Sequence, residues 1–251
     1  IFAIPYEMEF TLIGTTDVDH SDSSENPECS EEEKSYLIAF ANKYFKDKIS
    51  RKDIVWTYSG IRPLYDDRAQ NASAATRDYK LKVDRSAGAP ILNIFGGKIT
   101  TYRRLAESAM EIINEQLGGH EGVWTAGLPL PGGNFEVDKV EDLIKELKER
   151  FTFLTDTWAR RLVRAYGMEA AVVLGSAKFE EDLGRDFGGT LFEAEVLWLM
   201  KHEFAMTAED ILWRRSKLGL RLTPKQTDEL KGWMASARRK ISPPHTLKYV
   251  S

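Results

Sequence analysis

The sequence has very little cysteine, and this limits how the chain can be stabilised. Its 251 residues include one cysteine, Cys29, so no disulfide can form within the chain. No apolar run approaches the about 20 residues that span a bilayer. Glu7 and Glu9 also interrupt the first apolar stretch, which is therefore not typical of a signal peptide. These absences argue against a disulfide-rich secreted protein or a membrane-spanning one, and we expect a cytoplasmic protein.

Several short enzyme motifs are also missing. The chain has no G-x-G-x-x-G fingerprint, no Walker loop, no G-x-S-x-G and no H-E-x-x-H. The histidines have no metal-ligand spacing; they are His20, His120, His202 and His245. Hydrolase and metalloenzyme classes therefore lose support, and we predict no metal site.

The chain has no excess of positive charge. It carries 35 Lys and Arg against 39 Asp and Glu, a net charge of -4. Short basic runs such as Arg160-Arg161 and Arg214-Arg215 are more typical of solvated helix faces or ion pairs than of a binding stripe. Nucleic-acid binding is therefore disfavoured.

The most informative pattern present is an apolar strand that runs into a helix through Gly96-Gly97-Lys98. Apolar residues recur on one face of the expected helix, and Gly118-Gly119 ends it. The residues expected on the buried face are Ile99, Tyr102, Leu105, Ala109, Ile112 and Ile113. At the start of a helix the first N–H groups have no partner within the helix, and glycines let a ligand approach the main chain. The pattern predicts an anion site, although a plain turn with an exposed lysine remains the alternative.

Arg62 is a second candidate cation. It follows a β-branched and aromatic segment, residues 54–59, which predicts a strand, and Pro63 would end the pairing there. A guanidinium at a strand end can bind phosphate or carboxylate through two parallel hydrogen bonds. An ion pair with Asp66 or Asp67 is the alternative, and spacing alone does not show that Arg62 meets Lys98.

The first half of the chain predicts mixed secondary structure. Strands are expected at residues 1–4, 10–13 and 78–83, the last because its apolar residues alternate. A capping box of Ser30 and Glu33 predicts a helix over residues 31–45. Its expected buried face carries Tyr36, Leu37, Phe40, Ala41 and Tyr44.

The second half predicts helices throughout. A stretch rich in glycine and proline separates the halves, and we place a linker at residues 120–133 between regions 1–119 and 134–251. Four tryptophans at helical spacing are expected in the core; they are Trp158, Trp198, Trp213 and Trp233. The expected helices cover residues 136–150, 156–166, 169–174, 191–203, 207–216 and 224–240. The fold class is therefore α+β, with an all-α C-terminal domain.

Long ordered runs give the chain a resemblance to a known family. The runs are IGTTD (13–17), DIVWTYSGIRPL (53–64), TRDY (76–79), FGGKITTYR (95–103) and TAEDILWRRSKLGL (207–220). They closely resemble the FAD-dependent, quinone-linked glycerol-3-phosphate dehydrogenases, over nearly the whole chain.

The resemblance implies a fold with three parts. These are an N-terminal FAD-binding Rossmann-type region, a substrate domain built on an antiparallel sheet, and a helical C-terminal domain. Because the dinucleotide fingerprint is missing, we expect it upstream of Ile1. The chain would then be a C-terminal fragment with part of the substrate domain, truncated at its N-terminus, and one strand and helix of the flavin domain. We expect this fragment to lack bound FAD and activity.

The resemblance also implies roles for particular residues. Arg62 matches the arginine that binds substrate phosphate, and Lys98 is a candidate for both substrate binding and catalysis. The turn that approaches the flavin ring corresponds to Gly96, Gly97, Lys98, Ile99 and Thr100. No residue matches a general base.

The implied reaction oxidises sn-glycerol 3-phosphate to dihydroxyacetone phosphate by hydride transfer to FAD, with quinone as the electron acceptor. A homodimer and peripheral association with the inner face of the cytoplasmic membrane are further expectations. The competing hypothesis is that the helical region is an interaction module, for dimerisation or for docking on a membrane or partner.

Overall fold

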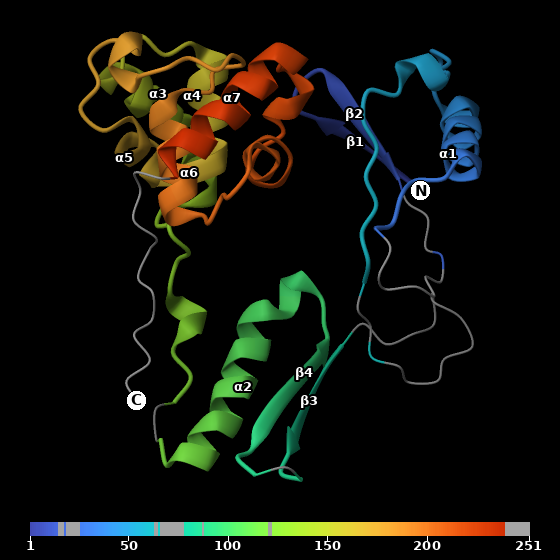
Figure 1. Ribbon diagram of the computed structural model, residues 1–251, viewed down its shortest axis with the longest axis vertical. Helices are drawn as coiled ribbons and strands as arrows, with labels where there is room; N and C mark the ends of the chain where they lie inside the picture. The colour runs from blue at the N-terminus through green and yellow to red at the C-terminus, as the bar shows by residue number, and fades with distance from the viewer. Residues whose placement is uncertain are drawn as a thin grey trace. The chain divides into compact units, whose positions relative to one another are not determined.

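The computed structural model divides the chain into two compact units, Ile1–Leu128 and Pro129–Ser251. It describes residues 1–14, 18, 26–62, 65, 78–86, 88–119 and 122–238. The elements of the two units are labelled in Figure 1. The division falls within the range predicted as a linker, while the roles assigned to the regions on either side stay predictions. Among the described residues, no helix is long and apolar enough to cross a membrane.

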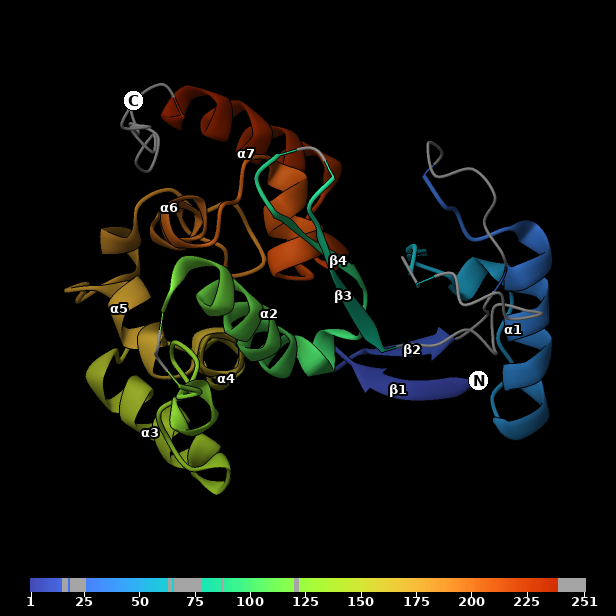
Figure 2. The same cartoon turned by 90° about the horizontal axis from the view of Figure 1, so that it is seen from below.

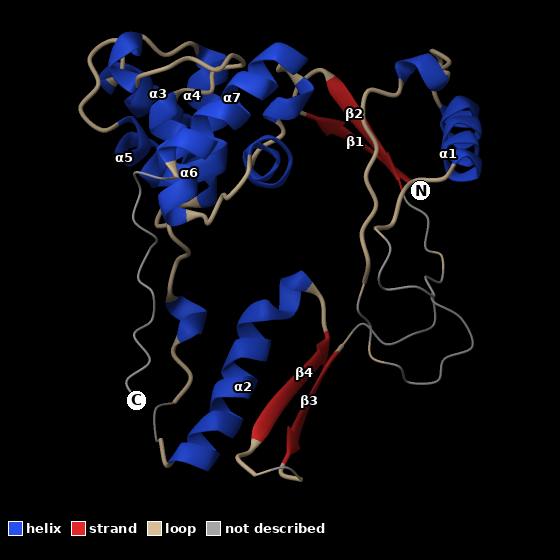
Figure 3. Cartoon of the chain, viewed as in Figure 1, coloured by secondary structure: helices blue, strands red, loops and turns tan. Residues whose placement is uncertain are grey.

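The first unit starts with an antiparallel hairpin of β1 (Phe2–Tyr6) and β2 (Phe10–Gly14). Both strands were predicted, and Figure 3 shows them in red. Their connection turns through Glu7 and Met8, which adopt positive φ angles of 45° and 69°. Such left-handed backbone lets the chain reverse within a few residues.

Helix α1 (Glu31–Tyr44) begins at the predicted capping box. The Ser30 hydroxyl accepts from the Glu33 N–H at 3.1 Å, and the Glu33 carboxylate accepts from the Ser30 N–H at 2.8 Å. The predicted buried face is only partly correct. Ala41 is buried, but Tyr36 and Tyr44 are 54% and 73% exposed. The rings of Tyr36 and Tyr44 instead contact the ring of Phe40, which lies between them along the same helix.

The strand predicted at residues 54–59 is wrong. These residues follow a short 3₁₀ turn (Arg51–Asp53) and pair with no strand among the described residues. Trp56 and Tyr58 stack at 4.9 Å, as alternate side chains of an extended backbone can. A high β-propensity favours extended backbone, but a strand also needs a neighbour to pair with.

A second antiparallel hairpin joins β3 (Tyr79–Asp84) to β4 (Ile91–Gly96). The alternation predicted for residues 78–83 is confirmed, since half-buried and exposed residues alternate along β3. Helix α2 (Tyr102–Leu117) follows and ends where predicted, at Gly118 with a φ of 76°. This strand–turn–helix segment carries the candidate site.

The second unit is helical, as predicted. Helix α4 has the predicted bounds, and α3 packs against it (Figures 1 and 2). Helix α3 starts four residues later than predicted, because residues 137–139 form a 3₁₀ turn. The segment predicted as a helix over 207–216 contains a π-helix, Asp210–Arg215. The α-helices are α3 (Val140–Arg150), α4 (Asp156–Tyr166), α5 (Ala170–Leu174), α6 (Glu193–His202) and α7 (Pro224–Ala237).

A continuous apolar core fills the second unit. Phe187, Leu191 and Leu230 are among its fully buried side chains. The predicted core role of the four tryptophans is confirmed. Trp158 is 4% exposed, and the other three are partly buried against the core; they are Trp198, Trp213 and Trp233. This core holds helices together that are individually only 5 to 14 residues long.

One of the glycines of the predicted break lies against the C-terminal end of α4. Gly132 has a φ of 74°, and its carbonyl accepts from the Met168 N–H at 2.9 Å. An added Cβ at Gly132 would overlap the Tyr166 carbonyl oxygen. Glycine is therefore required here both for conformation and for close approach.

Candidate functional site

The candidate site is the turn that joins β4 to α2. Gly96 ends the strand, Gly97 follows, and Lys98 precedes a 3₁₀ turn (Ile99–Thr101) that leads into α2. The sequence-predicted residues 96–100 are therefore consecutive members of one strand-to-helix turn. This local geometry agrees with the prediction, while the chemical roles assigned to the residues stay predictions.

Two left-handed glycines give the turn its shape. Gly96 and Gly97 have φ angles of 68° and 96°, which other residues rarely adopt. A Cβ on Gly97 would also lie 3.2 Å from Tyr79 Cβ on β3. Tyr79 pairs with Gly96 in the ladder, and its hydroxyl lies 3.3 Å from the Ser108 hydroxyl on α2. Tyr79 therefore fixes the turn between strand and helix, a role that the sequence pattern alone did not indicate.

The residues of the turn are exposed or half-buried. Lys98, Ile99 and Thr100 are exposed, and Gly96 and Gly97 are half-buried. The Lys98 carbonyl accepts from the Thr101 N–H at 3.0 Å and from its hydroxyl at 2.8 Å, which closes the first helical turn. The first N–H groups of a helix have no partner within it. They point out of the N-terminal end of the helix and carry partial positive charge.

The predicted buried face of this helix is wrong at its first two positions. Ile99 is 88% exposed and Tyr102 is 50% exposed, whereas Ala109 is buried. The 3₁₀ turn advances by about three residues per turn in place of 3.6, so a pattern extended back from α2 misplaces Ile99. The exposed apolar side chain of Ile99 lies beside the candidate anion site.

Positive charge accumulates around the start of α2. Its first turn has no acidic residue, although acidic residues are the ones favoured there. It carries Arg103 and Arg104 instead, and Arg104 is exposed. Arg103 contributes less to the positive potential, because its Nη1 donates to the Glu107 carboxylate at 2.6 Å, and that negative charge offsets its own. Together with Lys98, Arg104 increases the positive potential at the turn; a basic first turn was the signal that the sequence prediction overlooked.

Arg62 also belongs to the first unit, in the stretch after residues 51–53 that pairs with no strand among the described residues. It is exposed, but it does not end a strand, so that part of the prediction is wrong. Pro63, Asp66 and Asp67 lie outside the described residues, and so does the predicted alternative ion pair. The sharing of one pocket by Arg62 and Lys98 stays a prediction.

The second unit contains a buried polar cluster that the sequence did not reveal. Arg161 on α4 donates to both carboxylate oxygens of Glu195 on α6, each at 2.7 Å. The Tyr166 hydroxyl donates to the same carboxylate at 2.7 Å. Burial, with the nearby Glu195 charge, raises the pKa of Tyr166 well above its usual range, so its hydroxyl remains a donor.

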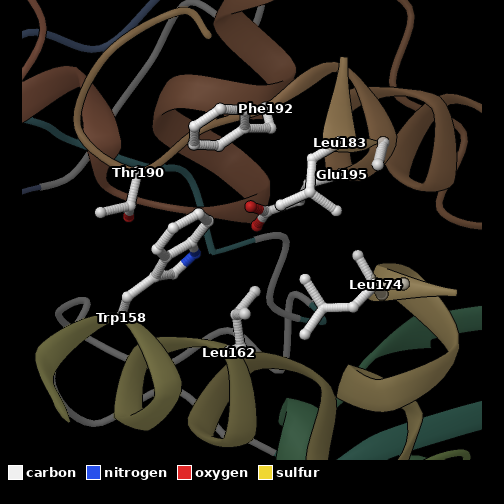
Figure 4. A pocket seen from close by; sticks show the side chains of 9 residues that line it. Trp158, Leu162, Leu174, Leu183, Thr190, Phe192 and Glu195 are labelled. Carbon is white, nitrogen blue, oxygen red and sulfur yellow. The ribbon is translucent and has the colours of Figure 1, made fainter. Parts of the chain in front are cut away.

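This cluster also holds an unusual loop conformation. Thr190 has a φ of 69°, and Arg161 donates to both its carbonyl and its hydroxyl, at 2.8 and 3.0 Å. Thr190 and Glu195 line a small, otherwise mostly apolar pocket (Figure 4). The pocket volume of about 10 Å³ is far too small for a flavin or a phosphorylated substrate. The cluster is thus a structural link between α4 and α6.

Two family models match most of the chain. Residues 1–102 match the FAD dependent oxidoreductase family, and residues 123–236 match the C-terminal domain of alpha-glycerophosphate oxidase. The candidate turn at 96–100 lies within the first of these regions. The helical second unit accounts for nearly all of the other.

Individual relatives agree with these matches. The chain is 43% identical to the aerobic glycerol-3-phosphate dehydrogenase of Escherichia coli, over 93% of the chain and 47% of that protein. It is 44% identical to a glycerol-3-phosphate dehydrogenase of Pseudomonas aeruginosa, over 94% of the chain and 46% of that protein. It is also 42% identical to the D-erythritol 1-phosphate dehydrogenase of Brucella abortus, over 94% of the chain and 47% of that protein.

The chain spans about half the length of the curated relatives it matches. Within that span both regions are matched in chain order, the FAD-dependent oxidoreductase region first and the helical domain second. The resemblance stated from the sequence is therefore confirmed. The chain belongs to the family of FAD-dependent glycerol-3-phosphate dehydrogenases.

Proposed function

We propose that this chain is part of an enzyme that oxidises sn-glycerol 3-phosphate to dihydroxyacetone phosphate by hydride transfer to FAD. One observation carries the proposal. A glycine turn at the start of α2, with the exposed Lys98 beside it, lies in the region matched to FAD-dependent oxidoreductases. The turn has the chemistry that a flavin ring edge requires, and the relatives named for this reaction match the chain almost end to end.

The residues of the turn suit the electron-rich edge of a flavin. A bound flavin would supply the hydride acceptor, and the electron-rich edge of its ring would carry negative charge once reduced. The N–H groups at residues 98–100 and the Lys98 ammonium would stabilise that charge. Gly96 and Gly97 have no side chains to keep the ring away from the main chain. Lys98, as an exposed flexible cation, is also placed to bind and orient the substrate.

Arg62 is the proposed phosphate ligand. A planar guanidinium binds two phosphate oxygens at once, and such charge-assisted hydrogen bonds are stronger than neutral ones. Arg62 is exposed in the structure and stands in the run that resembles the family's phosphate-binding segment. Glycerol 3-phosphate and D-erythritol 1-phosphate both carry a phosphate. Arg62 would therefore contribute to the affinity for either substrate and little to the discrimination between them.

The proposal is tested with Arg62→Ala in the complete enzyme. A charge-assisted hydrogen bond contributes about 1.5–3 kcal/mol, so the KM for glycerol 3-phosphate should rise by about 10- to 100-fold. Titration with FAD should give an unchanged dissociation constant. Arg164→Ala, an exposed arginine on α4, is the matched control and should leave both quantities unchanged. Equal losses of substrate and FAD affinity in Arg62→Ala would remove Arg62 from the substrate site.

D-erythritol 1-phosphate is a second candidate substrate. A dehydrogenase named for it is 42% identical to this chain, so identity does not separate the two substrates. Both are polyol phosphates, and the proposed roles of Arg62 and Lys98 serve either one. Measuring kcat/KM for both substrates with the complete enzyme decides between them. A preference for D-erythritol 1-phosphate would replace the first substrate while keeping the flavin chemistry.

The remaining proposals concern the electron acceptor and the assembly. We propose quinone as the acceptor, and a cytoplasmic homodimer that associates peripherally with the inner face of the membrane. The helical second unit is a candidate for the contact, because it forms a compact body with its own core. Light scattering and liposome flotation of the complete protein test these points. A monomer that ignores lipid would contradict the proposed dimer and membrane contact.

We further propose that the 251-residue chain does not turn over by itself. It spans about half the length of its relatives, and none of its residues is assigned as a general base. The purified chain should therefore show no flavin absorbance and should not reduce a dye with glycerol 3-phosphate. Flavin absorbance together with dye reduction would contradict this proposal.

A further inference from the structure

A tyrosine close to Arg62 in the chain packs on the hairpin of β3 and β4. Tyr65 lies three residues after Arg62 and is half-buried. Its hydroxyl accepts from Lys82 Nζ on β3 at 2.7 Å, and the same Nζ lies 4.8 Å from the centre of the Tyr65 ring. The rings of Tyr65 and Phe95, which is on β4, meet edge to face with their centres 5.9 Å apart. Tyr65 therefore contacts both strands of the hairpin.

This contact lies on the face of the hairpin that does not meet α2. Side chains alternate along a strand, so Tyr79 and Lys82 point to opposite faces. The Tyr79 hydroxyl is the one that lies beside α2. Phe95 shares the other face with Lys82, because it pairs with Lys80 in the ladder. Phe95 remains 40% exposed, and the Tyr65 ring covers part of it.

Three interactions act together in the contact of Tyr65 with Lys82 and Phe95. The hydrogen bond has a charged donor, which makes it stronger than a neutral one. The ammonium is attracted to the face of the tyrosine ring, and the two aromatic rings meet in a favoured geometry. Replacing Tyr65 by phenylalanine removes the hydrogen bond and keeps the ring, whereas alanine removes all three interactions.

The length of the chain limits how far Arg62 and Lys98 can lie from this contact. Arg62 is three residues from Tyr65, and Lys98 is three residues from Phe95. Three residues of fully extended backbone span at most about 11 Å. Each of the two cationic residues therefore has its backbone within that reach of the same pair of rings.

We infer that Tyr65 is a positioning residue for substrate binding, because its contact with Lys82 and Phe95 holds the Arg62 segment beside the strand that leads to Lys98. This inference rests on the proposed function, in which Arg62 and Lys98 bind one substrate. Tyr65 itself would not touch the substrate and would act through Arg62. A ligand group that is held in place before binding loses less freedom on binding, so affinity is higher.

Substrate affinity in the complete enzyme tests the inference. Tyr65→Ala should raise the KM for glycerol 3-phosphate by about 3- to 10-fold, less than the loss of Arg62 itself. Tyr65→Phe should raise it less, because the ring contact with Phe95 is kept. Calorimetric titration with dihydroxyacetone phosphate should show the same order of effects without turnover. The dissociation constant for FAD should stay unchanged, which separates lost positioning from lost folding.

A second variant tests the contact from the hairpin side. Lys82→Met keeps the aliphatic stem and removes the donor and its charge, so the KM should rise by about 2- to 5-fold. Lys80→Met is the matched control, since Lys80 is the exposed lysine two residues earlier on the same face of β3. The control should leave the KM unchanged. An equal rise in both variants would attribute the effect to lost surface charge and overturn the inference.

Combining Tyr65→Ala with Arg62→Ala distinguishes positioning from a general structural effect. If Tyr65 acts through Arg62, Tyr65→Ala should raise the KM no further once Arg62 is absent. The inference is overturned if Tyr65→Ala raises the KM by the same factor in both backgrounds. It is also overturned if Arg62→Ala raises the KM and Tyr65→Ala does not. Failure of the proposed function would differ, because the unaltered complete enzyme would then oxidise neither polyol phosphate.

Discussion

The two units of this protein bury their apolar side chains to very different extents. Among the described residues of the first unit, the buried apolar side chains are Ala41 and Ala109, while the second unit has a continuous core. Phe2, Ile94 and Ile99 of the first unit are 40%, 50% and 88% exposed. The first unit is held by hairpin ladders, a helix cap and local hydrogen bonds. The second is held by packing, which contributes more stability for each residue ordered.

The candidate functional site and the buried, stabilising contacts lie in different units. The candidate flavin-facing turn lies in the first unit, and its residues Lys98, Ile99 and Thr100 are exposed. The buried ion pair lies in the packed unit, where it links helices. A functional site needs accessible polar groups, whereas a core needs their exclusion or complete pairing, so the two requirements are met in different parts of the chain.

The largest expected effect is that of Glu195→Ala. Removing this carboxylate leaves Arg161 charged and largely buried, and breaking such a pair costs about 3–5 kcal/mol. Urea unfolding followed by tryptophan fluorescence measures the loss, since four of the six tryptophans lie in the second unit. Glu141→Ala is the matched control, because Glu141 pairs with Arg160 in an exposed position. If both variants lost a similar free energy of unfolding, the buried Arg161–Glu195 pair would be no more stabilising than the exposed Arg160–Glu141 pair.

A core truncation should show that packing stabilises one unit much more than the other. Leu230 on α7 is fully buried, and Leu230→Ala should lower the free energy of unfolding by about 2–5 kcal/mol. Leu117 at the end of α2 is 81% exposed, and Leu117→Ala should change it by less than about 0.5 kcal/mol. Hydrogen exchange resolves the units: Leu230→Ala should speed exchange in residues 129–238. Faster exchange confined to the first unit would contradict the comparison.

Two glycine substitutions should have opposite signs. Gly97→Ala places a side chain on backbone with a φ of 96° and 3.2 Å from Tyr79 Cβ, which should cost about 1–3 kcal/mol. Gly232→Ala, within α7 and with open space around it, should stabilise by about 0.5–1 kcal/mol. Chemical denaturation and hydrogen exchange near each site measure both changes. A neutral Gly97→Ala would mean that the turn does not require glycine.

The sequence predicted the elements whose signals are local. The capping box of Ser30 and Glu33, the alternation along β3 and the C-terminal glycine of α2 each depend on residues a few positions apart. Such signals are readable because their physical cause lies within the same short segment. The span of α4 was correct for the same reason, since its start is fixed by the Thr155 side chain, which accepts from the Trp158 N–H.

The predictions failed where a distant partner decides the outcome. Residues 54–59 have strand propensity but pair with no strand among the described residues. Tyr36 and Tyr44 have the right spacing for burial, yet remain exposed because nothing described covers that side of α1. For the candidate site, the turn at 96–100 was predictable, whereas the pairing of Tyr79 with Gly96 and its hydroxyl contact with Ser108 were not.

The sequence by itself determined the α+β class, the helical second half, the family and the glycine turn, because composition, periodicity and long ordered runs are properties of the chain. Only the tertiary structure decided which apolar faces are buried and which polar groups meet. Arg161, Tyr166 and Glu195 lie up to 34 positions apart, and no spacing rule connects them. Their meeting depends on how α4 packs on the elements around α6, which is a consequence of the whole core and not of any one segment.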